Sequence, residues 1–384
     1  MGTVAGRLAF LACVTAGACI GCATADRPPD FPPEPPRVVL ARPLPQYDAL
    51  FQRKEGWTGA DGAYSVPLGK DATLWLFGDT WIGRITQEGH AGSAMINNSL
   101  AVQKGLRPEG ASVDFLYRTT SEGRPMSMFT PADGNGVLWL MSGLSTENGL
   151  FLFAAQVEMR GQGVFGFAQR GVWLVHVKEP AGSPLEWKVS QARSPWWRPA
   201  KGGNMAFGSA MLRDGRFVYV YGYREDWSRG MGGRGMVTAR VEADQIGRFD
   251  QWRFLAGQEW VEDPNRATEG FAGLATEYSV SYLPGLKNYV AVYTENGLSN
   301  RILARFSFTP YGPWSWPVLL YECPETGWDK SYFCYAGKAH PELALSGDEL
   351  IVTYVTNSLD FTKAVKDARI YWPRFVRVKL GRAT

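Results

Sequence analysis

Three carboxylates stand at the edges of segments that otherwise alternate like half-buried strands. Asp61 and Asp79 bracket the run DGAYSVPLGKDATLWLFGDTW, and Glu277 opens the run EYSVSYLPGLKNYVAVYTENG. Asp is depleted in strands because its short polar side chain competes for the backbone, so each aspartate either shapes a turn or serves a site. Two carboxyl groups that face each other across a sugar-sized space, one protonated and one ionised, provide the chemistry of glycosidic bond hydrolysis.

The surroundings of the carboxylates predict different roles for them. Glu277 lies in the apolar run AGLATEYSVSY, and such surroundings suit a carboxyl group that acts as a general acid. Asp61 lies among glycines and polar turn residues, which predicts an ionised general base. Asp79 is a second candidate for the base, and a residue that caps a bend between strands is the alternative.

Aromatic and polar side chains near the same strand openings are candidates for sugar binding, because rings with a polar edge stack on sugar faces. Most of the tryptophans should instead belong to the core. His340 has an alternative as a satisfied buried imidazole, and Glu342 as a surface residue. The candidates are Trp57, Trp81, Asn98, Asn204, Trp227, His340 and Glu342.

The elements that position these residues repeat along the chain. A polar opening, an alternating strand, a tight turn and an apolar aromatic strand recur at intervals of roughly 60 to 75 residues, beginning at Asp61, Gly136, Phe207, Glu277 and His340. Short alternating runs predict an all-β body. Five such units predict a five-bladed β-propeller, in which the first strands begin at one mouth; a β-sandwich with an extra domain is the alternative.

The N-terminal segments are predicted to lie outside this domain. Residues 1–22 combine Arg7, a short apolar run and small residues, which is typical of a secretory signal peptide. Gly21-Cys22 resembles the processing site of bacterial lipoproteins, so we expect Cys22 to carry lipid. The proline-rich residues 23–45 are predicted to be an extended tether, and residues 46–384 a single domain.

Cysteine usage and charge limit the partners. Cys323 and Cys334 are the only cysteines beyond the leader, so export predicts a disulfide between them. Three histidines argue against a Cys/His metal site, and the glycine run SRGMGGRGM lacks the following helix that a dinucleotide site needs. We therefore expect no metal and no cofactor. The net charge of +3 comes without basic blocks, so we expect no nucleic acid.

Several phrases together resemble a known family. DGAYSVPL, LWLFGDTWIG, MINNSLAVQ, TEYSVSYLPGLKNYVAVY and KAHPELALSGDELIVTYVTNS resemble a bacterial family labelled as a domain of unknown function. Members of that family are linked to glycoside hydrolase family 183, endo-D-arabinanases with a five-bladed propeller. The resemblance covers roughly Tyr47 to Leu380.

A more distant likeness concerns the carboxylates alone. An Asp opening the first unit and a Glu opening the fourth are similar to the five-bladed propellers of glycoside hydrolase family 43, which implies Asp61 as base and Glu277 as acid. The third acidic residue of that family has no counterpart, because Asn204 and Ser209 stand in its place.

Two functions follow from the sequence. The first is an exported glycoside hydrolase, anchored in the cell envelope by lipid or secreted, that cleaves a furanose-containing polysaccharide with inversion. The second is a carbohydrate-binding lipoprotein that captures glycans without cleaving them. In both, the partner is a poly- or oligosaccharide, the membrane is met only through the lipid anchor, and we expect a monomer. A protein-binding propeller is a third alternative.

Overall fold

Short alternating runs bounded by glycine, proline and aspartate fold into antiparallel sheets throughout the part of the chain that the computed structural model describes, residues 32, 34–161 and 163–382. The prediction of an all-β body is therefore confirmed. The predicted signal peptide and the lipid-bearing Cys22 lie outside the described residues and stay predictions. Among the described helices, none is long and apolar enough to cross a membrane.

Five larger sheets follow one another along the chain. The first consists of β3 (Tyr64–Pro67), β4 (Ala72–Phe77), β7 (Ser99–Lys104) and β8 (Ser112–Leu116). The second consists of β11 (Val137–Thr146), β12 (Gly149–Met159), β13 (Phe167–Val177) and β14 (Val189–Arg193). The third consists of β15 (Arg198–Ala200), β16 (Gly203–Asp214), β17 (Phe217–Asp226), β18 (Arg234–Glu242), β19 (Arg253–Ala256) and β20 (Glu259–Val261). The fourth consists of β21 (Tyr278–Leu283), β22 (Asn288–Thr294), β23 (Arg301–Ser307) and β24 (Val318–Glu322). The fifth consists of β25 (Tyr332–Ala339), β26 (Glu349–Ser358), β27 (Arg374–Gly381) and β1 (Arg37–Pro43).

Shorter elements connect and cover these sheets. Two small sheets consist of β2 (Glu55–Ala60), β5 (Thr80–Arg84) and β6 (Ala94–Ile96), and of β9 (Arg118–Thr119) and β10 (Pro125–Met126). The helices are α1 (Pro45–Phe51) and α2 (Phe361–Lys366). The 3-10 turns are η1 (Pro184–Glu186), η2 (Trp227–Gly232), η3 (Phe249–Gln251), η4 (Pro264–Arg266), η5 (Pro324–Gly327) and η6 (Pro341–Leu343).

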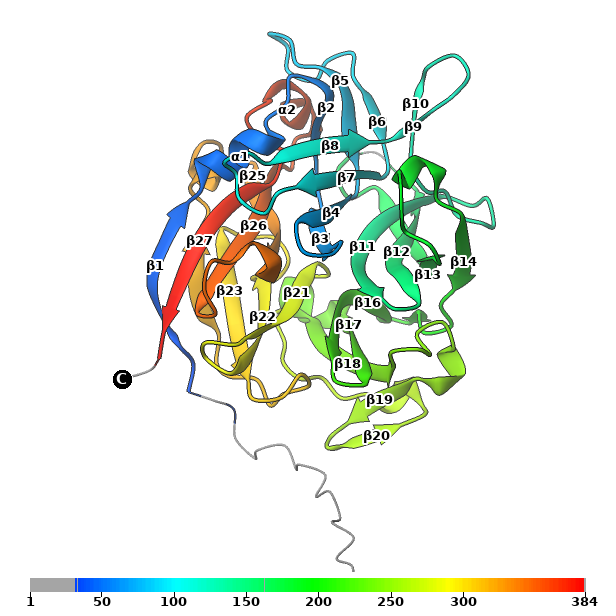
Figure 1. Ribbon diagram of the computed structural model, residues 1–384, viewed down its shortest axis with the longest axis vertical. Helices are drawn as coiled ribbons and strands as arrows, with labels where there is room; N and C mark the ends of the chain where they lie inside the picture. Colours follow the sequence, from blue (N-terminus) through cyan, green and yellow to red (C-terminus); the bar gives the residue numbers. More distant parts are fainter. Residues whose placement is uncertain (1–31, 33, 162, 383–384) are drawn as a thin grey trace, which may run out of the picture.

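The inner strands of the five larger sheets lie side by side around a common centre (Figure 1). Strand β3 contacts β11, β11 contacts β16, β16 contacts β21, and β21 contacts β25. The fifth sheet also contacts the first, because the Lys338 ammonium of β25 lies 4.2 Å from the centre of the Tyr64 ring in β3. Four of the five predicted phrases open at or near an inner strand. The fifth does not, because its inner strand β25 ends at Ala339, before His340.

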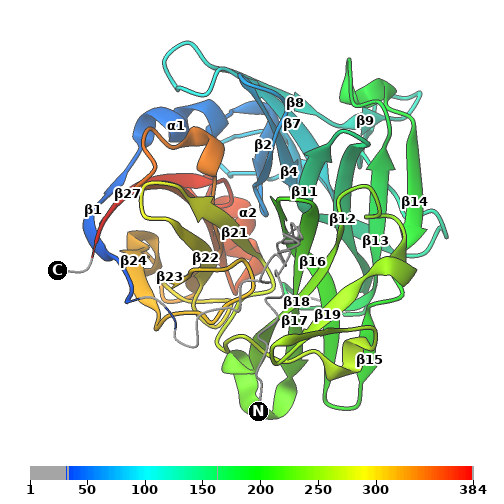
Figure 2. The ribbon, with the colours of Figure 1, turned by 60° about the horizontal axis from the view of Figure 1, so that its bottom comes forward.

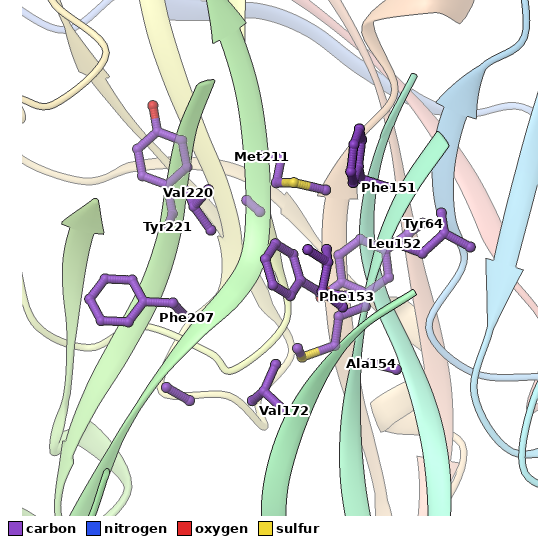
Figure 3. Close-up of a cluster of buried hydrophobic side chains, with 14 of the residues drawn as sticks. Tyr64, Phe151, Leu152, Phe153, Ala154, Val172, Phe207, Met211, Val220 and Tyr221 are labelled. Atoms are coloured by element: carbon purple, nitrogen blue, oxygen red, sulfur yellow. The ribbon is translucent and has the colours of Figure 1, made fainter. Parts of the chain in front are cut away.

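Apolar side chains fill the space between neighbouring sheets. Phe153 of β12 meets Phe207 and Met211 of β16 in a cluster that joins the second and third sheets (Figure 3). A Cβ at Gly208 would overlap the Phe153 ring, so only glycine lets that ring pack on the backbone of β16. Such burial of large aromatic surfaces is the main stabilisation available to sheets that meet face to face.

The second half of the predicted tether belongs to the folded domain. Strand β1 pairs with β27 from Arg37↔Gly381 to Pro43↔Val376, with a bulge at Val39, and both views show the two strands side by side (Figure 2). The high proline content of this segment argued against a strand, but an edge strand tolerates proline. The tether prediction is therefore wrong for Arg37–Pro43, which cover the edge of β27.

Removing β1 should destabilise the domain. We expect a variant that starts at Leu44 to lose on the order of 3 kcal/mol of unfolding free energy relative to one that starts at Arg37, since each lost backbone hydrogen bond is worth about 0.5–1.5 kcal/mol. Urea denaturation of both variants measures the difference. Coincident unfolding curves would contradict the assignment of β1 to the fold.

The two cysteines lie beside each other between the fourth and fifth sheets. Both are buried and unbonded in the structure, and burial, followed by the neighbouring Cys334 thiol, raises the pKa of Cys323. Cys334 also contacts Thr356 Oγ1 at 3.4 Å. The disulfide itself therefore stays a prediction, which the proximity of the thiols permits.

If the protein is exported, oxidation should close this pair. We expect the bond to add about 2–3 kcal/mol to the unfolding free energy, because it closes a short loop. Thiol titration of the unfolded, unreduced protein from an oxidising compartment should find neither cysteine reactive. Two reactive thiols in that sample would rule the bond out.

Candidate active site

Three short breaks separate strands of the first sheet from strands of a small neighbouring sheet. These breaks contain the polar residues of the site. Strand β2 leads into β3 through Asp61–Ala63, β4 leads into β5 through Gly78–Asp79, and β6 leads into β7 through Asn97–Asn98. Beyond these breaks, β2, β5 and β6 form a sheet of their own. The aspartates therefore lie between two sheets, where their backbone no longer belongs to a regular ladder.

Backbone hydrogen bonds hold the first two breaks together. The Asp61 N–H donates to the Asp79 carbonyl at 3.2 Å, and the Gly78 N–H donates to the Asp61 carbonyl at 3.2 Å. A Cβ at Gly78 would overlap Asp61 Oδ1. In the sequence Gly78-Asp79, the glycine thus makes room for the carboxylate of Asp61, and the next residue supplies the second carboxylate of the site.

Two tyrosines hold the carboxylate of Asp61. Tyr335 of β25 and Tyr371 donate to Asp61 Oδ2 at 3.1 and 3.3 Å. Burial raises the pKa of Asp61 well above its usual range, and the nearby charges of Asp79 and Glu277 raise it further; the two tyrosine hydrogen bonds only partly oppose this. This upward shift of the pKa runs against the sequence-based expectation of an ionised Asp61, whose role as general base stays a prediction.

Asp79 accepts two hydrogen bonds on one oxygen. Asn97 Nδ2 and Trp139 Nε1 donate to Asp79 Oδ1 at 3.0 and 2.8 Å. Burial raises the pKa of Asp79 to about 6, against the effect of both donors. Asp79 is therefore mostly ionised at neutral pH, and its charge is one of the causes that raise the pKa of Asp61.

Glu277 faces a buried cation. Lys338 Nζ lies 3.7 Å from Glu277 Oε1 and donates to the Ala336 carbonyl at 2.8 Å, while its side chain is 1% exposed. Burial lowers the pKa of Lys338 to about 8, and Glu277 and Asp61 oppose this shift. The site thus contains a Glu277–Lys338 ion pair.

Backbone strain concentrates around Asp61. Ala63, Ala336 and Tyr371 all adopt left-handed φ angles, of 54°, 58° and 68°. Such angles are rare for residues with a Cβ and cluster at functional sites. Ala336 lies in the bulge of β25 between Tyr335 and Lys338, so one irregularity directs both side chains toward the carboxylates.

Three predicted sugar-binding residues are structural instead. Trp57 is 2% exposed and stacks on Phe115, with ring centres 4.3 Å apart. Trp81 is buried, stacks on His90 and packs in a cluster with Tyr371, so it supports that ring from behind. Asn98 is fully buried.

Asn98 shows the structural role most clearly. Its Nδ2 donates to the carbonyls of Phe129 and Leu138 at 2.8 and 2.9 Å, and its Oδ1 accepts from the Phe129 N–H at 2.9 Å. It therefore joins the first sheet to the second. Its neighbour Asn97 is the one that reaches the site.

His340 also serves the fold. Its two ring nitrogens lie 2.7 Å from Ser65 Oγ and 2.7 Å from Thr353 Oγ1, and it packs 4.9 Å from the Trp75 ring. Burial lowers the pKa of His340 to about 3. The contact with Ser65 is not a nucleophile–base pair, because the histidine is a poor base and its second partner is a hydroxyl, not a carboxylate.

Glu342 follows His340 and is half-buried, with Oε1 lacking a hydrogen-bond partner among the described residues. Burial raises its pKa, against a hydrogen bond from Ser65. No contact with Asp61, Asp79 or Glu277 is recorded, and sugar binding by Glu342 stays a prediction.

Asn204 and Trp227 lie at a different place, a cavity of about 480 Å³ at the end of the third sheet. Asn204 lines it, and Trp227 adjoins it through a hydrogen bond from its backbone N–H to the Gly202 carbonyl. Among the described residues, no group of three or more His, Cys, Asp or Glu side chains is arranged to hold a metal ion.

Sequence reasoning missed Lys338, Tyr371 and Trp139 as neighbours of the carboxylates. Lys338 opens the phrase KAHPELALSGDELIVTYVTNS, but nothing in that phrase indicates a contact with Glu277. Tyr371 follows no motif, and its approach to Asp61 depends on a contact across 310 residues of chain. Trp139 carried a usable signal, since it stands near the opening of the second phrase.

The fold and the site define an all-β chain with acidic residues gathered where the inner strands of its first and fourth sheets begin. The chain belongs to the family described as "Domain of unknown function (DUF5005)", which it matches over residues 45–380. A search of curated proteins found no match.

A solved structure shares the fold, and others are more distantly similar. A Bacteroides ovatus protein, provisionally described as a hydrolase, is 19% identical with a TM-score of 0.68, covering 88% of this chain and 90% of that one. An exo-β-1,3-galactanase of Phanerochaete chrysosporium, with galactotriose, is 11% identical with a TM-score of 0.48, covering 87% and 66%. The GH43_1 enzyme of Xanthomonas citri, complexed with xylotriose, is 14% identical with a TM-score of 0.47, covering 89% of each chain.

The raised pKa of Asp79 makes a prediction for stability. Its folded-state pKa of about 6 exceeds the unfolded value of about 3.9, so the folded state binds more protons between these values and stability falls as pH rises through them. Asp79→Asn keeps an oxygen that can accept from Asn97 and Trp139 and removes this loss. We expect the variant to be more stable than wild type by on the order of 1–3 kcal/mol at pH 7.5, with the gain disappearing near pH 4.

Urea unfolding at the two pH values measures this difference. The exposed Asp71 provides a matched control, and Asp71→Asn should unfold like wild type at both. A pH-independent effect of Asp79→Asn would show that Asp79 does not titrate in this range.

Proposed function

We propose that this chain is a glycoside hydrolase that uses Asp61 and Glu277 as its acid–base pair. The observation that carries the proposal is the difference between the two environments. Burial and the nearby charge of Asp79 raise the pKa of Asp61, whereas Glu277 is paired with the Lys338 ammonium. Two carboxyl groups held in different protonation states are the requirement for glycosidic cleavage.

The roles follow from the protonation states. Asp61 donates its proton to the leaving oxygen, and Glu277 activates the water that attacks the anomeric carbon in a single displacement. This reverses the assignment implied by the likeness to glycoside hydrolase family 43. Asp79 keeps the proton on Asp61 by like-charge repulsion, and the tyrosine hydroxyls orient that carboxyl group.

The wider setting is part of the same proposal. The five sheets with neighbouring inner strands support a five-bladed β-propeller, and the phrases that resemble glycoside hydrolase family 183 support a furanose-containing polysaccharide, such as an arabinan, as substrate. Export and a lipid anchor at Cys22 would place the enzyme in the cell envelope.

Substitution of the two carboxyl groups tests the pair. On unactivated polysaccharide, we expect Asp61→Asn and Glu277→Gln each to lower turnover by about 10² to 10⁴, the usual contribution of general acid or base catalysis. Asp71→Asn is the control and should keep wild-type turnover. The measurement is reducing-end release from a panel of arabinans and other plant and microbial glycans.

Leaving groups and added nucleophiles separate the two roles. Asp61→Asn should keep most of its activity on dinitrophenyl glycosides, because their leaving group needs no proton. Glu277→Gln should lose activity on the same substrates. Added azide should restore the activity of Glu277→Gln. The opposite pattern would restore Asp61 as base and Glu277 as acid. Full activity in both folded variants would overturn the site, and glycan binding without cleavage by wild type would indicate a capture protein.

A further inference from the structure

The cavity at the end of the third sheet contains cations without anionic partners. It is lined by Arg198, Lys201 and Arg224 as well as by acidic residues. No ion pair to these three cations is recorded among the described residues. At about 480 Å³, the cavity has the size of a small-molecule site.

The acidic residues of the cavity are already neutralised by other arginines. Arg229 contacts Asp226 at 3.1 Å and Glu269 at 3.2 Å, and Arg234 contacts Glu225 at 2.6 Å. The local excess of positive charge is therefore not compensated within the protein.

Strand register brings two of the free cations to one face of the sheet. Arg198 pairs with Met205, and Met205 pairs with Arg224, so the two guanidinium groups flank one buried methionine, because directly paired residues share a face. Arg224 donates to the Asn265 carbonyl at 3.3 Å and keeps further N–H groups for a ligand. Like charges placed in this way repel each other unless an anion lies between them.

One further feature fits a sugar. Trp227 is 60% exposed beside the Lys201–Gly202 turn, and an exposed indole is a platform for a sugar face.

We propose that this cavity binds an anionic sugar residue, held through its carboxylate or phosphate by Arg198 and Arg224 and through its ring by Trp227. This deepens the proposed function, on which it rests: the polysaccharide is acidic.

Calorimetry with an Asp61→Asn protein, which does not consume its ligand, tests this. The probes are uronate-containing oligosaccharides with their carboxyl-reduced counterparts, and phosphorylated oligosaccharides with their dephosphorylated counterparts. We expect at least one acidic probe to bind about tenfold or more tightly than its neutral counterpart at low salt, with a smaller gap at high salt. The pair that shows the gap identifies carboxylate or phosphate.

The gap should depend on the two arginines. Adding Arg198→Gln and Arg224→Gln should abolish it, and Arg198→Gln alone, at an exposed residue, should reduce it without risk to folding. Arg216→Gln, at the opposite end of the β16–β17 hairpin, is the control and should leave it unchanged. Equal binding of every acidic and neutral pair, or a gap that survives the double variant, would overturn the proposal.

Failure of this proposal and failure of hydrolysis are distinguishable. Wild-type cleavage of neutral glycans with no preference for acidic ones would leave the hydrolase in place and remove the anionic subsite. Tight binding of an acidic probe that depends on both arginines, without cleavage by wild type, would support the subsite and remove the hydrolase.

Discussion

The site depends on one electrostatic constraint: two half-buried aspartates lie at breaks in adjacent strands. Ionising both would place two negative charges together in a medium that screens them poorly. Burial and the charge of Asp79 accordingly raise the pKa of Asp61, and the surroundings of Asp61 fit a carboxyl group that holds its proton more tightly than usual. Gly78 makes room for the carboxyl group, two tyrosines donate to it, and arginines lie elsewhere.

The architecture serves this constraint through its irregularities. Regular antiparallel ladders would bury every side chain on one of two faces, with no place for a carboxylate between strands. The breaks at Asp61–Ala63 and Gly78–Asp79 and the bulge at Ala336 turn polar groups inward. Each costs backbone strain or lost pairing, and the packed sheets on either side offset it. Strand β1 stabilises the fold at a distance from the site, because it covers the edge of β27 in the fifth sheet.

The parts of this arrangement that are local in sequence could be predicted. Alternation and turn residues predicted the strands, and three repeat openings lie where inner strands begin, while the opening at Phe207 lies inside β16. The fifth could not be found, because the bulge between Tyr335 and Lys338 breaks the alternation of β25, so the regular run of β26 was read as the opening. The sequence also does not show which side chains are buried. Asn97 and Asn98 are adjacent and chemically identical, yet Asn97 binds Asp79 and Asn98 joins two sheets.

A lysine, and not an arginine, faces Glu277. An arginine keeps its charge in any environment, so it would favour the ionised form of both nearby carboxyl groups at every pH. The pKa of the buried lysine falls to about 8, so part of the cost of burial falls on the cation. Arginines without an anionic partner among the described residues lie instead at the end of the third sheet. The near-neutral net charge of the chain thus conceals a division between a centre of half-buried carboxyl groups and a cavity that holds fixed positive charge.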